Sequence, residues 1–285
     1  MTRRAELEHH LSALEDIHDI MASMKTLALL ETRKLGRFMD TQRRVEDGIE
    51  RIAADYLAHY PRPPTAADLF SVTLLVGSER GFVGDFNEVL IRHWQDQSHD
   101  RAVIGLGQKL AAKLAQEPRT LGVLEGASIA EEIPDILTRL VGQLAALQTE
   151  HGELALTVVH HGESHSEILT TPVLPPFQAL PPVPARSHPP RLNLAPPAFF
   201  EALLDHYLFA FLHTLLYRSL MAENQRRIEH LGGALHHLEE ETEALQLKRN
   251  ALRQEEIVEE IEVILLSVQA MLEPHRPGKR KRRQP

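Results

Sequence analysis

The chain has 285 residues, a hydrophobic fraction of 43%, a charged fraction of 25% and a formal net charge of −9. These values are near the average for globular chains, so wholesale disorder is excluded, and the length allows one large or two ordinary domains. The absence of cysteine excludes disulfides, thiolate metal sites and a cysteine nucleophile. We expect no membrane span, because every apolar run is much shorter than roughly 18 residues. We expect no secretory signal, because residues 1–6 lead into an acidic, histidine-containing stretch and not into an apolar one.

Charge is distributed unevenly along the chain. Residues 198–273 carry fourteen acidic and six basic side chains, whereas the last twelve residues carry six basic and no acidic ones. Because phosphate neutralisation needs a basic face, the acidic body argues against nucleic-acid binding. The basic tail could bind an anionic lipid or a nucleic acid, but we favour a solvated tail.

The first long segment, residues 2–59, contains no proline and repeats its apolar residues in heptads. One seam is formed by Leu7, Leu14, Met21, Ala28, Leu35, Ile49 and Tyr56, and a second seam by Ile17, Met24, Phe38, Val45 and Ile52; His10, Glu31 and Gln42 interrupt the pattern. Spacings of three and four place both seams on one side of a helix. Such a helix is roughly 85 Å long, so it must project from a small domain, and its apolar stripe needs a partner.

The middle of the chain alternates between short strand and helix patterns. Three prolines at 61, 63 and 64 end the first helix, because proline cannot continue the hydrogen-bond ladder. We expect strands at 70–76, 102–106, 120–124, 154–160 and 167–171, and helices at 85–94, 108–116 and 133–149. Strands that alternate with helices indicate an α/β layer structure with a mainly parallel sheet.

A second long helix follows a proline-rich connector. Residues 172–197 hold ten of the eighteen prolines, which favours an extended segment. Apolar residues then recur at helical spacing, at Leu203, Tyr207, Phe211, Leu215, Ile228, Leu231, Leu235, Leu238, Leu245 and Leu252, and after a local shift at Ile257, Ile261, Ile264, Val268 and Met271. Because antiparallel pairing buries both stripes, we expect the two long helices to form a coiled coil with the α/β domain attached where the first helix ends.

Four stretches of the chain suggest a family. They are residues 20–28 (IMASMKTLA), 78–87 (SERGFVGDFN), 219–228 (SLMAENQRRI) and 250–257 (NALRQEEI). In their order and separation they resemble the gamma subunit of F-type ATP synthases, which shows T-x-A-M-x-M-V-A, S-D-R-G-L-C-G-x-F-N, S-L-x-S-E-N-x-x-R-M and N-x-x-R-Q-x-x-I-T-x-E-L. The resemblance covers about residues 3–273.

The departures from these patterns point to a divergent branch. Glu79, Phe82 and Val83 replace Asp, Leu and Cys of the turn motif, and Ile228 and Val258 replace Met and Thr. The connector and the basic tail are also atypical. The branch that we consider is the alternate F-type lineage, in which the translocated ion can be sodium instead of a proton.

The resemblance implies an antiparallel two-helix coiled coil from the two chain ends with an inserted Rossmann-like α/β domain. We divide the chain accordingly into an N-terminal coiled-coil helix (1–60), an α/β domain (68–171), the connector (172–197), a C-terminal coiled-coil helix (198–273) and a basic tail (274–285).

The resemblance also implies a function, that of a non-catalytic central rotor shaft. The coiled coil would turn inside a hexamer of alternating alpha and beta subunits, and the α/β domain, with the epsilon subunit, would stand on the membrane ring of c subunits. Ion flow through the ring would drive ATP synthesis, and ATP hydrolysis would turn the shaft back. Such a chain is peripheral on the cytoplasmic face of the bacterial inner membrane and needs no cofactor or metal.

By match to the family, two groups of residues contact the beta subunit. Met24 and Lys25 lie where the shaft meets the moving beta lobe, and Arg33, Lys34 and Arg37 continue a basic stripe that suits this acidic lobe. Arg253 and Gln254 match positions that hydrogen-bond to the catch loop of the beta subunit. On the residue pattern alone, Met24 is a heptad core residue and the others are ordinary solvated helix surface.

Two further patterns have structural interpretations. Residues 77–84 follow a strand but lack both the Gly-Lys-Ser/Thr ending and the G-x-G-x-x-G spacing of phosphate loops, so we interpret Gly81 and Gly84 as residues of a tight turn. The seventeen histidines include adjacent pairs at 9–10, 160–161 and 236–237 without metal-ligand spacing, and we expect them to be solvated.

Two other functions compete with the rotor. A coiled-coil adaptor that presents an α/β module, unrelated to ATPases, explains the periodicity but not the four ordered motifs. An enzyme built on the α/β domain would need a catalytic cluster, and no nucleophile and base can be paired in the sequence.

Overall fold

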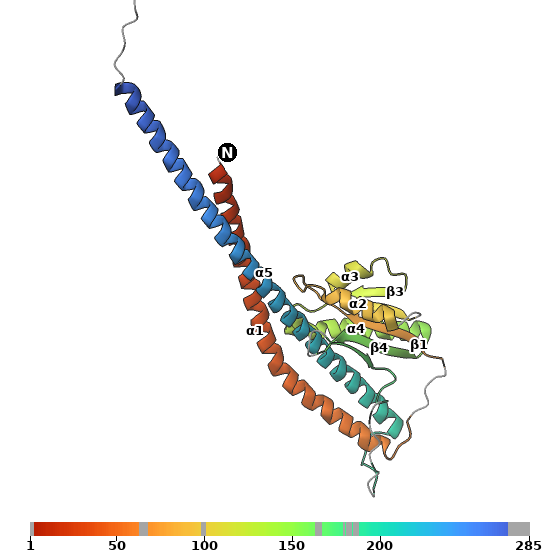
Figure 1. The fold of residues 1–285 in the computed structure, drawn as a ribbon. Coiled ribbons are helices and arrows are strands. Elements are labelled where there is room, and N and C mark those ends of the chain that lie inside the picture. The colour runs from red at the N-terminus through yellow and green to blue at the C-terminus, as the bar shows by residue number, and fades with distance from the viewer. Residues whose placement is uncertain are drawn as a thin grey trace, which may run out of the picture. The chain divides into compact units, whose positions relative to one another are not determined.

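The computed structural model describes residues 3–62, 68–97, 101–162, 167–178, 180, 184 and 188–272 (Figure 1). In chain order its elements are α1 (Arg3–Leu57), β1 (Phe70–Val76), α2 (Phe86–Gln97), β2 (Ala102–Leu106), α3 (Gln108–Leu114), β3 (Thr120–Leu124), the short 3-10 helix η1 (Ala130–Glu132), α4 (Ile133–His151), β4 (Leu154–His161), β5 (Ile168–Pro172) and α5 (Pro196–Leu272). They form a larger unit, Ser23–Gly232, and a smaller unit, Met1–Ala22 with Gly233–Pro285. The basic tail lies outside the described residues.

The sheet of the larger unit has five strands in the order β3-β2-β1-β4-β5. β1 pairs in parallel with β2 and β4, β2 pairs in parallel with β3, and β5 is antiparallel to β4. The expected strands are confirmed; β4 ends one residue later than predicted, and β5 begins and ends one residue later. Central strands covered on both faces read as continuous apolar runs, and residues 72–76 of β1 are all buried.

Two layers cover the faces of this sheet. One face packs against α4 and against the parts of α1 and α5 in this unit, through residues such as Leu35, Leu137 and Leu216. The other face packs against α2 and α3 around Trp94, the only tryptophan of the chain. The guanidinium of Arg119 lies 4.5 Å from the centre of that ring. The α/β core is therefore built directly onto both long helices.

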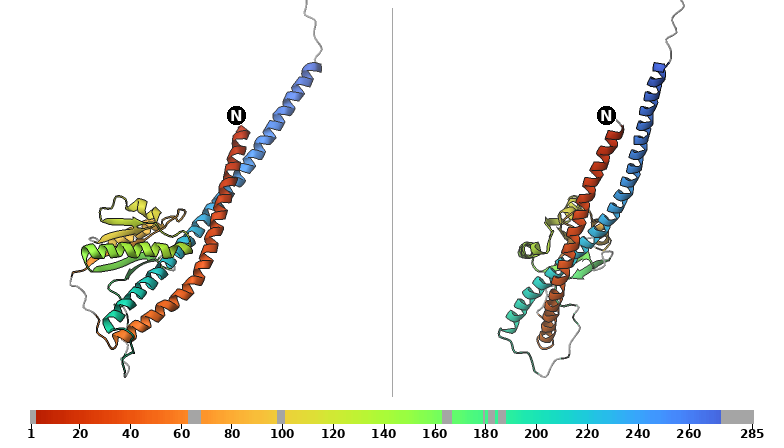
Figure 2. Two further views of the ribbon diagram at one scale, coloured as in Figure 1. Left: turned by 180° about the vertical axis from the view of Figure 1, so that it is seen from behind. Right: turned by 90° about the vertical axis from the view of Figure 1, so that its left-hand side faces the viewer.

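In the larger unit, α1 and α5 run side by side and antiparallel, as the views of Figure 2 also show. The rings of Phe38 and Tyr217 stack with centroids 5.6 Å apart, and farther along α1 the Tyr56 hydroxyl donates to the Pro196 carbonyl at 2.8 Å. Residues later in α1 thus contact residues earlier in α5. This confirms antiparallel pairing of the long helices within the unit.

The first predicted seam of α1 is confirmed, but the second is wrong by one position. Six of the seven residues of the first seam are buried, and Ile49 is half-buried. In the second seam Met24 is half-buried, whereas Ile17, Phe38, Val45 and Ile52 are 41–49% exposed. The line that is covered instead is Leu11, His18, Lys25, Thr32, Met39, Glu46 and Ala53. Because four of these residues are polar, a search for apolar heptads selects the neighbouring line.

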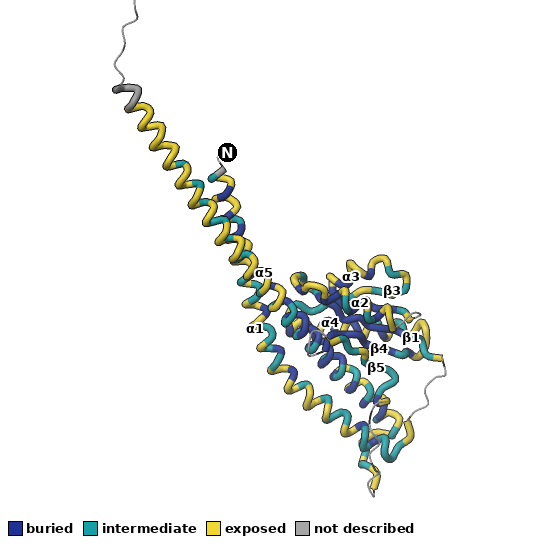
Figure 3. The backbone as a smooth tube through the Cα atoms, viewed as in Figure 1, coloured by how far each residue is buried: buried dark blue, intermediate teal, exposed yellow. Residues whose placement is uncertain are grey.

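In the smaller unit, the start of α1 pairs antiparallel with the far part of α5. Arg4 Nη1 lies 3.1 Å from Glu256 Oε2, and His18 Nε2 lies 3.7 Å from Glu239 Oε1. Since α1 begins at Arg3, no described segment of this unit covers α5 beyond Glu256 (Figure 3).

The apolar line predicted for the last turns of α5 is therefore exposed, which corrects the expectation of a buried seam. Ile257, Ile261, Ile264 and Val268 are 46–60% exposed. Met271, the last residue of this line, lies beyond the described side chains.

One stretch of α5 is more apolar than the short apolar runs of the sequence indicate. An 18-residue window of this helix is apolar enough for a span by length and composition alone, and 44% of that window is buried inside the protein. A core helix of a soluble domain passes the same test, so the packing of α5 against the sheet is a sufficient reason for its apolarity.

His160 and His161, expected at the surface, are each only 2% exposed at the end of β4. The His160 Nδ1–H donates to the carbonyl of His161 at 2.9 Å. The His161 ring stacks on Phe86 at 3.6 Å and donates from Nε2 to the Phe86 carbonyl at 2.9 Å. Because β4 lies between β1 and β5, its last residues are covered, whereas the pairs at 9–10 and 236–237 are exposed as expected.

Burial lowers the pKa of His160, so the folded state favours its neutral form. The unfolded chain takes up that proton near pH 6.5, and stability is therefore complete above this pH and decreases as the pH falls toward the lower folded pKa. We expect the unfolding free energy, followed by Trp94 fluorescence in urea, to fall less between pH 7.5 and 5.5 in His160→Gln than in the unchanged chain. His236→Gln is the exposed control, and equal pH dependence in all three chains would contradict the role of His160.

Candidate functional site

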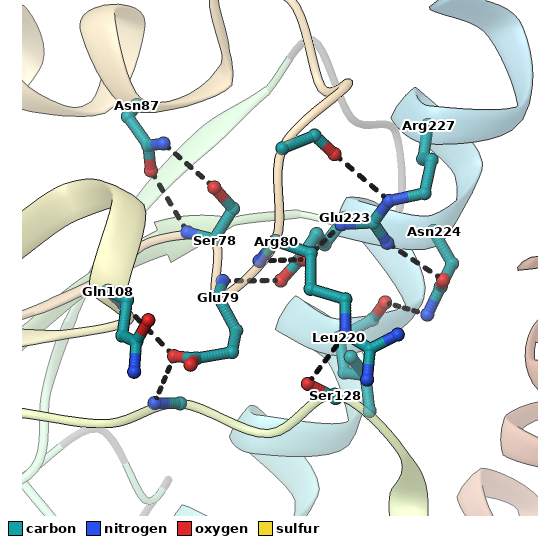
Figure 4. Close-up of polar contacts among 12 residues, drawn as sticks. Ser78, Glu79, Arg80, Asn87, Gln108, Ser128, Leu220, Glu223, Asn224 and Arg227 are labelled. Atoms are coloured by element: carbon teal, nitrogen blue, oxygen red, sulfur yellow. Dashed lines mark hydrogen bonds and ion pairs between the residues drawn. The ribbon is translucent and has the colours of Figure 1, made fainter. Parts of the chain in front are cut away.

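Two of the sequence motifs meet in space inside the larger unit. Residues 78–85 form the turn between β1 and α2, and residues 219–228 lie on the part of α5 that faces this turn (Figure 4). The meeting point contains Glu223, Asn224 and Arg227, which are 3–5% exposed. Because charged residues are almost never buried without partners, this cluster is the candidate functional site.

Glu223 binds the turn through both carboxylate oxygens. Its Oε2 accepts the backbone N–H of Glu79 at 3.2 Å, and its Oε1 accepts that of Arg80 at 3.3 Å. Oε1 also forms an ion pair with Arg227, one helical turn farther along α5. Backbone donors and a guanidinium thus replace the water that this carboxylate would bind if it were exposed.

Arg227 is held by three acceptors. Besides Glu223, its Nη1 donates to Asn224 Oδ1 at 3.0 Å, and its Nε donates to the Gly81 carbonyl at 3.2 Å. Asn224 in turn donates to the Leu220 carbonyl at 2.9 Å. The guanidinium therefore connects α5 to the turn a second time, and we call Glu223, Asn224 and Arg227 with residues 79–81 the clamp.

The clamp holds two charged side chains away from water. Burial raises the pKa of Glu223, whereas the charge of Arg227 and the N–H donors of the turn oppose that rise. The free-energy cost of removing water from two charges is offset only when the geometry of the pair is good and the remaining polar atoms are hydrogen-bonded. Here every named bond supports the ionised pair, so loss of either partner leaves a buried charge uncompensated.

The turn that receives α5 is itself rigid. Ser78 and Asn87 bond each other twice, through the Ser78 N–H to Asn87 Oδ1 at 2.9 Å and the Asn87 amide to Ser78 Oγ at 2.8 Å. Glu79 Oε2 accepts the N–H of Gln108 at 2.9 Å and that of Gly126 at 2.7 Å. The ends of the turn are thereby fixed to α2, α3 and the loop after β3.

Of the two glycines predicted for this turn, only Gly84 has the left-handed backbone that demands glycine. Its φ is +59°, and a Cβ there would lie 3.3 Å from His230 of α5. Gly81 contributes its carbonyl to Arg227 and has no positive φ. Phe82 takes a φ of 61° without being glycine and is 48% exposed.

An outer ion pair joins the same two segments. Arg226 Nη2 lies 2.6 Å from Asp85 Oδ1, and this hydrogen bond lowers the pKa of Asp85. Both side chains reach water, so the pair contributes at most about 1 kcal/mol.

The residues expected to contact a partner differ in their exposure and in their contacts within the chain. In the larger unit Arg33 and Arg37 are exposed, Met24 is half-buried, and the Lys25 side chain fills the space beside Gly232. Lys34 is engaged within the chain, by Glu131 and by Glu31 at 3.8 Å. Arg253 and Gln254 are exposed on α5 of the smaller unit.

Glu223, Asn224 and Arg227 belong to one of the four sequence motifs, but the motif alone does not predict their role. A signal was present, because a Glu and an Arg four residues apart lie on one helix face, within a stretch dense in apolar residues. Glu31, which interrupted the heptads, also has a role, since its Oε1 accepts the N–H of Ala130 at 2.6 Å.

The clamp leaves little space around the Glu223 carboxylate. The cavity beside Glu223 measures only about 20 Å³, lined by Gly77, Gly126 and Ser219 among others, which is room for one water. Among the residues that the structure describes, no group of three His, Asp or Glu side chains is placed to hold a metal ion.

Comparison with known proteins gives a consistent result. Residues 3–271 match the family model described as ATP synthase. The chain is similar in fold to a chain of the Euglena gracilis mitochondrial ATP synthase (OSCP/F1/c-ring, rotational state 3), with 13% identity, a TM-score of 0.64 and coverage of 97% of this chain and 98% of that one. No curated protein sequence matches the chain.

Two further solved structures share the fold. One is the rotor of the Euglena enzyme in rotational state 1, with 14% identity, a TM-score of 0.57 and coverage of 89% and 98%. The other is the central stalk and c-ring of the Tetrahymena thermophila mitochondrial ATP synthase, with 14% identity, a TM-score of 0.53 and coverage of 75% and 99%.

The clamp generates a prediction about stability. We expect Arg227→Met to lower the unfolding free energy by about 3–5 kcal/mol, because Glu223 remains buried without its counter-charge. The double variant Glu223→Leu with Arg227→Met should recover part of this loss. The exposed neighbour gives the control: Arg226→Met should cost no more than about 1 kcal/mol in the same urea titration. Equal costs for the two arginines would refute a special role of the buried pair.

Proposed function

The chain belongs to the gamma-subunit family of F-type ATP synthases, and we propose from this premise how its parts serve that family's task. As such a subunit it is the central rotor shaft, which mechanically couples ion flow through a membrane ring to ATP synthesis or hydrolysis in the catalytic hexamer. It acts at the membrane periphery as part of the complex. The coiled-coil adaptor unrelated to ATPases is not favoured.

The observation that carries the mechanism is the clamp. A rotor that receives torque on its α/β domain and delivers it through its long helices must not slip where the two are joined. Glu223 and Arg227, which form an ion pair with each other on α5, join this helix to the turn after β1 by three hydrogen bonds to the backbone of residues 79–81. We assign to this clamp the transfer of torque between the α/β domain and α5.

The shaft itself is the pair of long helices. We assign α5 beyond Glu256, with its exposed Ile257, Ile261 and Ile264, to the interior of the alpha/beta hexamer, where a partner surface would cover these apolar residues. Arg253 and Gln254 are exposed, which supports their assignment to the catch loop of the beta subunit.

For the moving beta lobe, exposure supports Arg33 and Arg37 as docking residues, whereas Met24 is half-buried. Lys25 and Lys34 remain in this proposed group, but both also contact other parts of the chain. Partly exposed ion pairs of this kind are worth about 0–1 kcal/mol, which suits a contact that is broken at every step.

The α/β domain is proposed to be Rossmann-like and to bind no nucleotide. The order β3-β2-β1-β4 is that of half a doubly wound sheet, in which ligands bind beyond the carboxyl ends of the strands where the order reverses, here between β1 and β4. The turn after β1 lies at this place, and the Glu223 carboxylate takes the two backbone N–H groups that could bind a phosphate. This occupied turn supports the proposal that the chain is a non-catalytic subunit.

We assign the chain the partners of the family: the alpha and beta subunits around the shaft, and the epsilon subunit and the c-ring at the α/β domain. The proposed location is the cytoplasmic face of a bacterial inner membrane. The departures at Glu79, Phe82 and Val83 support a divergent F-type branch, and the choice of ion belongs to the ring.

Affinity purification tests the assignment. The tagged chain, isolated in mild detergent at low salt, should co-purify with alpha-like, beta-like and epsilon-like chains, and ATP hydrolysis should appear in the complex and not in the isolated chain. A stable lone protein or homodimer without ATPase partners would support the adaptor instead.

A second test addresses the contact residues. Arg253→Ala should leave the complex assembled but lower the number of ions pumped per ATP hydrolysed, because the helix loses its bond to the catch loop. Lys248→Ala, an exposed change on the same stretch of α5, is the control. If the two variants pump equally well per ATP, Arg253 has no part in coupling.

A further inference from the structure

We propose that the segment between β3 and α4, residues 126–132, is a strap that carries load from α1 to the clamp on α5. This inference rests on the proposed function as a rotor, and it adds a positioning element that none of the four motifs contains. The segment contacts α1 at one end and the turn that binds Glu223 at the other, and all these residues lie in the larger unit.

The α1 end of the strap is held by charge. Glu31 Oε1 accepts the N–H of Ala130 at 2.6 Å, and the Glu31 side chain is only 14% exposed. The Lys34 ammonium pairs with Glu131 and lies 3.8 Å from Glu31. Its hydrogen bond to Glu131 raises the pKa of Lys34 and lowers that of Glu131, so both remain charged at neutral pH. One helical turn of α1 thus holds two successive residues of the strap.

The other end of the strap is held by the turn. The Gly126 N–H donates to Glu79 Oε2 at 2.7 Å, and Arg80 Nε donates to Ser128 Oγ at 2.9 Å. Glu79 and Arg80 are the two residues whose own N–H groups bind Glu223. An unbroken path therefore runs from α1 through the strap and the turn to α5 (Figure 4 draws its Arg80, Ser128 and Glu223 part).

The strap is stiff between its ends. Glu132 Oε2 accepts the N–H of Ser128 at 2.7 Å and that of Ile129 at 3.4 Å, immediately before α4 begins. A Cβ at Gly126 would lie 3.2 Å from the Gly107 backbone, so the segment also passes close to the start of α3. Carboxylates of Glu79, Glu132 and Glu31 thereby bind four backbone N–H groups of one short loop, which limits its bending.

The position of these bonds argues for load transfer more than for stability. The Lys34–Glu131 pair is 35% and 56% exposed, and pairs this open to water add little to the unfolding free energy. They do tie α1 directly to the segment that leads to the clamp. Their loss should therefore change how well rotation is transmitted while the chain still folds.

The test compares matched lysines in the assembled complex. We expect Lys34→Met to fold and assemble normally, because a partly exposed ion pair adds little to stability, while the number of ions pumped per ATP falls. Lys113→Met is the control, because Lys113 pairs with Glu88 within the α/β domain, at similar exposure and away from α1. ATP hydrolysis and pumping are measured in the same vesicles.

Charge reversal separates the strap from other roles of Lys34. Lys34→Glu combined with Glu131→Lys should restore pumping per ATP, whereas a lysine that acts only by touching the beta subunit would not be rescued by a change in its own chain. Unaltered pumping in Lys34→Met, an equal loss in Lys113→Met, or failure of the reversed pair would each overturn the strap. Failure of the unchanged chain to assemble with ATPase subunits would instead reject the rotor function itself.

Discussion

The structure of the larger unit depends on one constraint: a buried carboxylate must have all its water replaced. Glu223 meets it only because two consecutive N–H groups of the turn after β1 and the guanidinium of Arg227 converge on it. That convergence requires the turn to be fixed, which explains the paired bonds of Ser78 with Asn87 and the left-handed backbone at Gly84. The conformation of the turn and the docking of α5 therefore depend on each other. If the turn moved, Glu223 would be a buried charge without partners, which destabilises the fold strongly.

The sheet could be predicted almost completely from the sequence, and the reason is burial on both faces. β1, β2 and β4 are short apolar runs bounded by turn residues, a pattern typical of strands in a covered parallel sheet. The clamp could be predicted only in part. The motif letters were visible, but which side chains of residues 219–228 face the turn depends on the rotation of a helix on which every residue from 211 to 228 is buried or half-buried.

The misplaced seam of α1 shows where heptad patterns fail. Lys25, Thr32 and Glu46 lie on the covered line, whereas Phe38 and Val45 lie on the open one. Long polar side chains can cover apolar surface with their stems while their heads reach water or a partner, so a covered position need not be apolar. The prediction of a buried seam at the end of α5 fails for a different reason. The apolar residues do recur at helical spacing, but no described part of this chain covers them.

The charged contacts of the chain can be ranked by how far water reaches them. Where α5 joins the α/β domain, charges are buried and fully bonded; where α1 joins it through Lys34, they are half open to water; and at Arg33, Arg37 and Arg253 they are exposed. Attraction between charges weakens as water reaches them, so the buried bonds of the clamp are stronger than ion pairs that stay open to water. A rotating part needs this order, since under load the weakest contact yields first. The yielding contacts should be those with the surrounding subunits, which must break and re-form at each step, and not those that hold the shaft to its base.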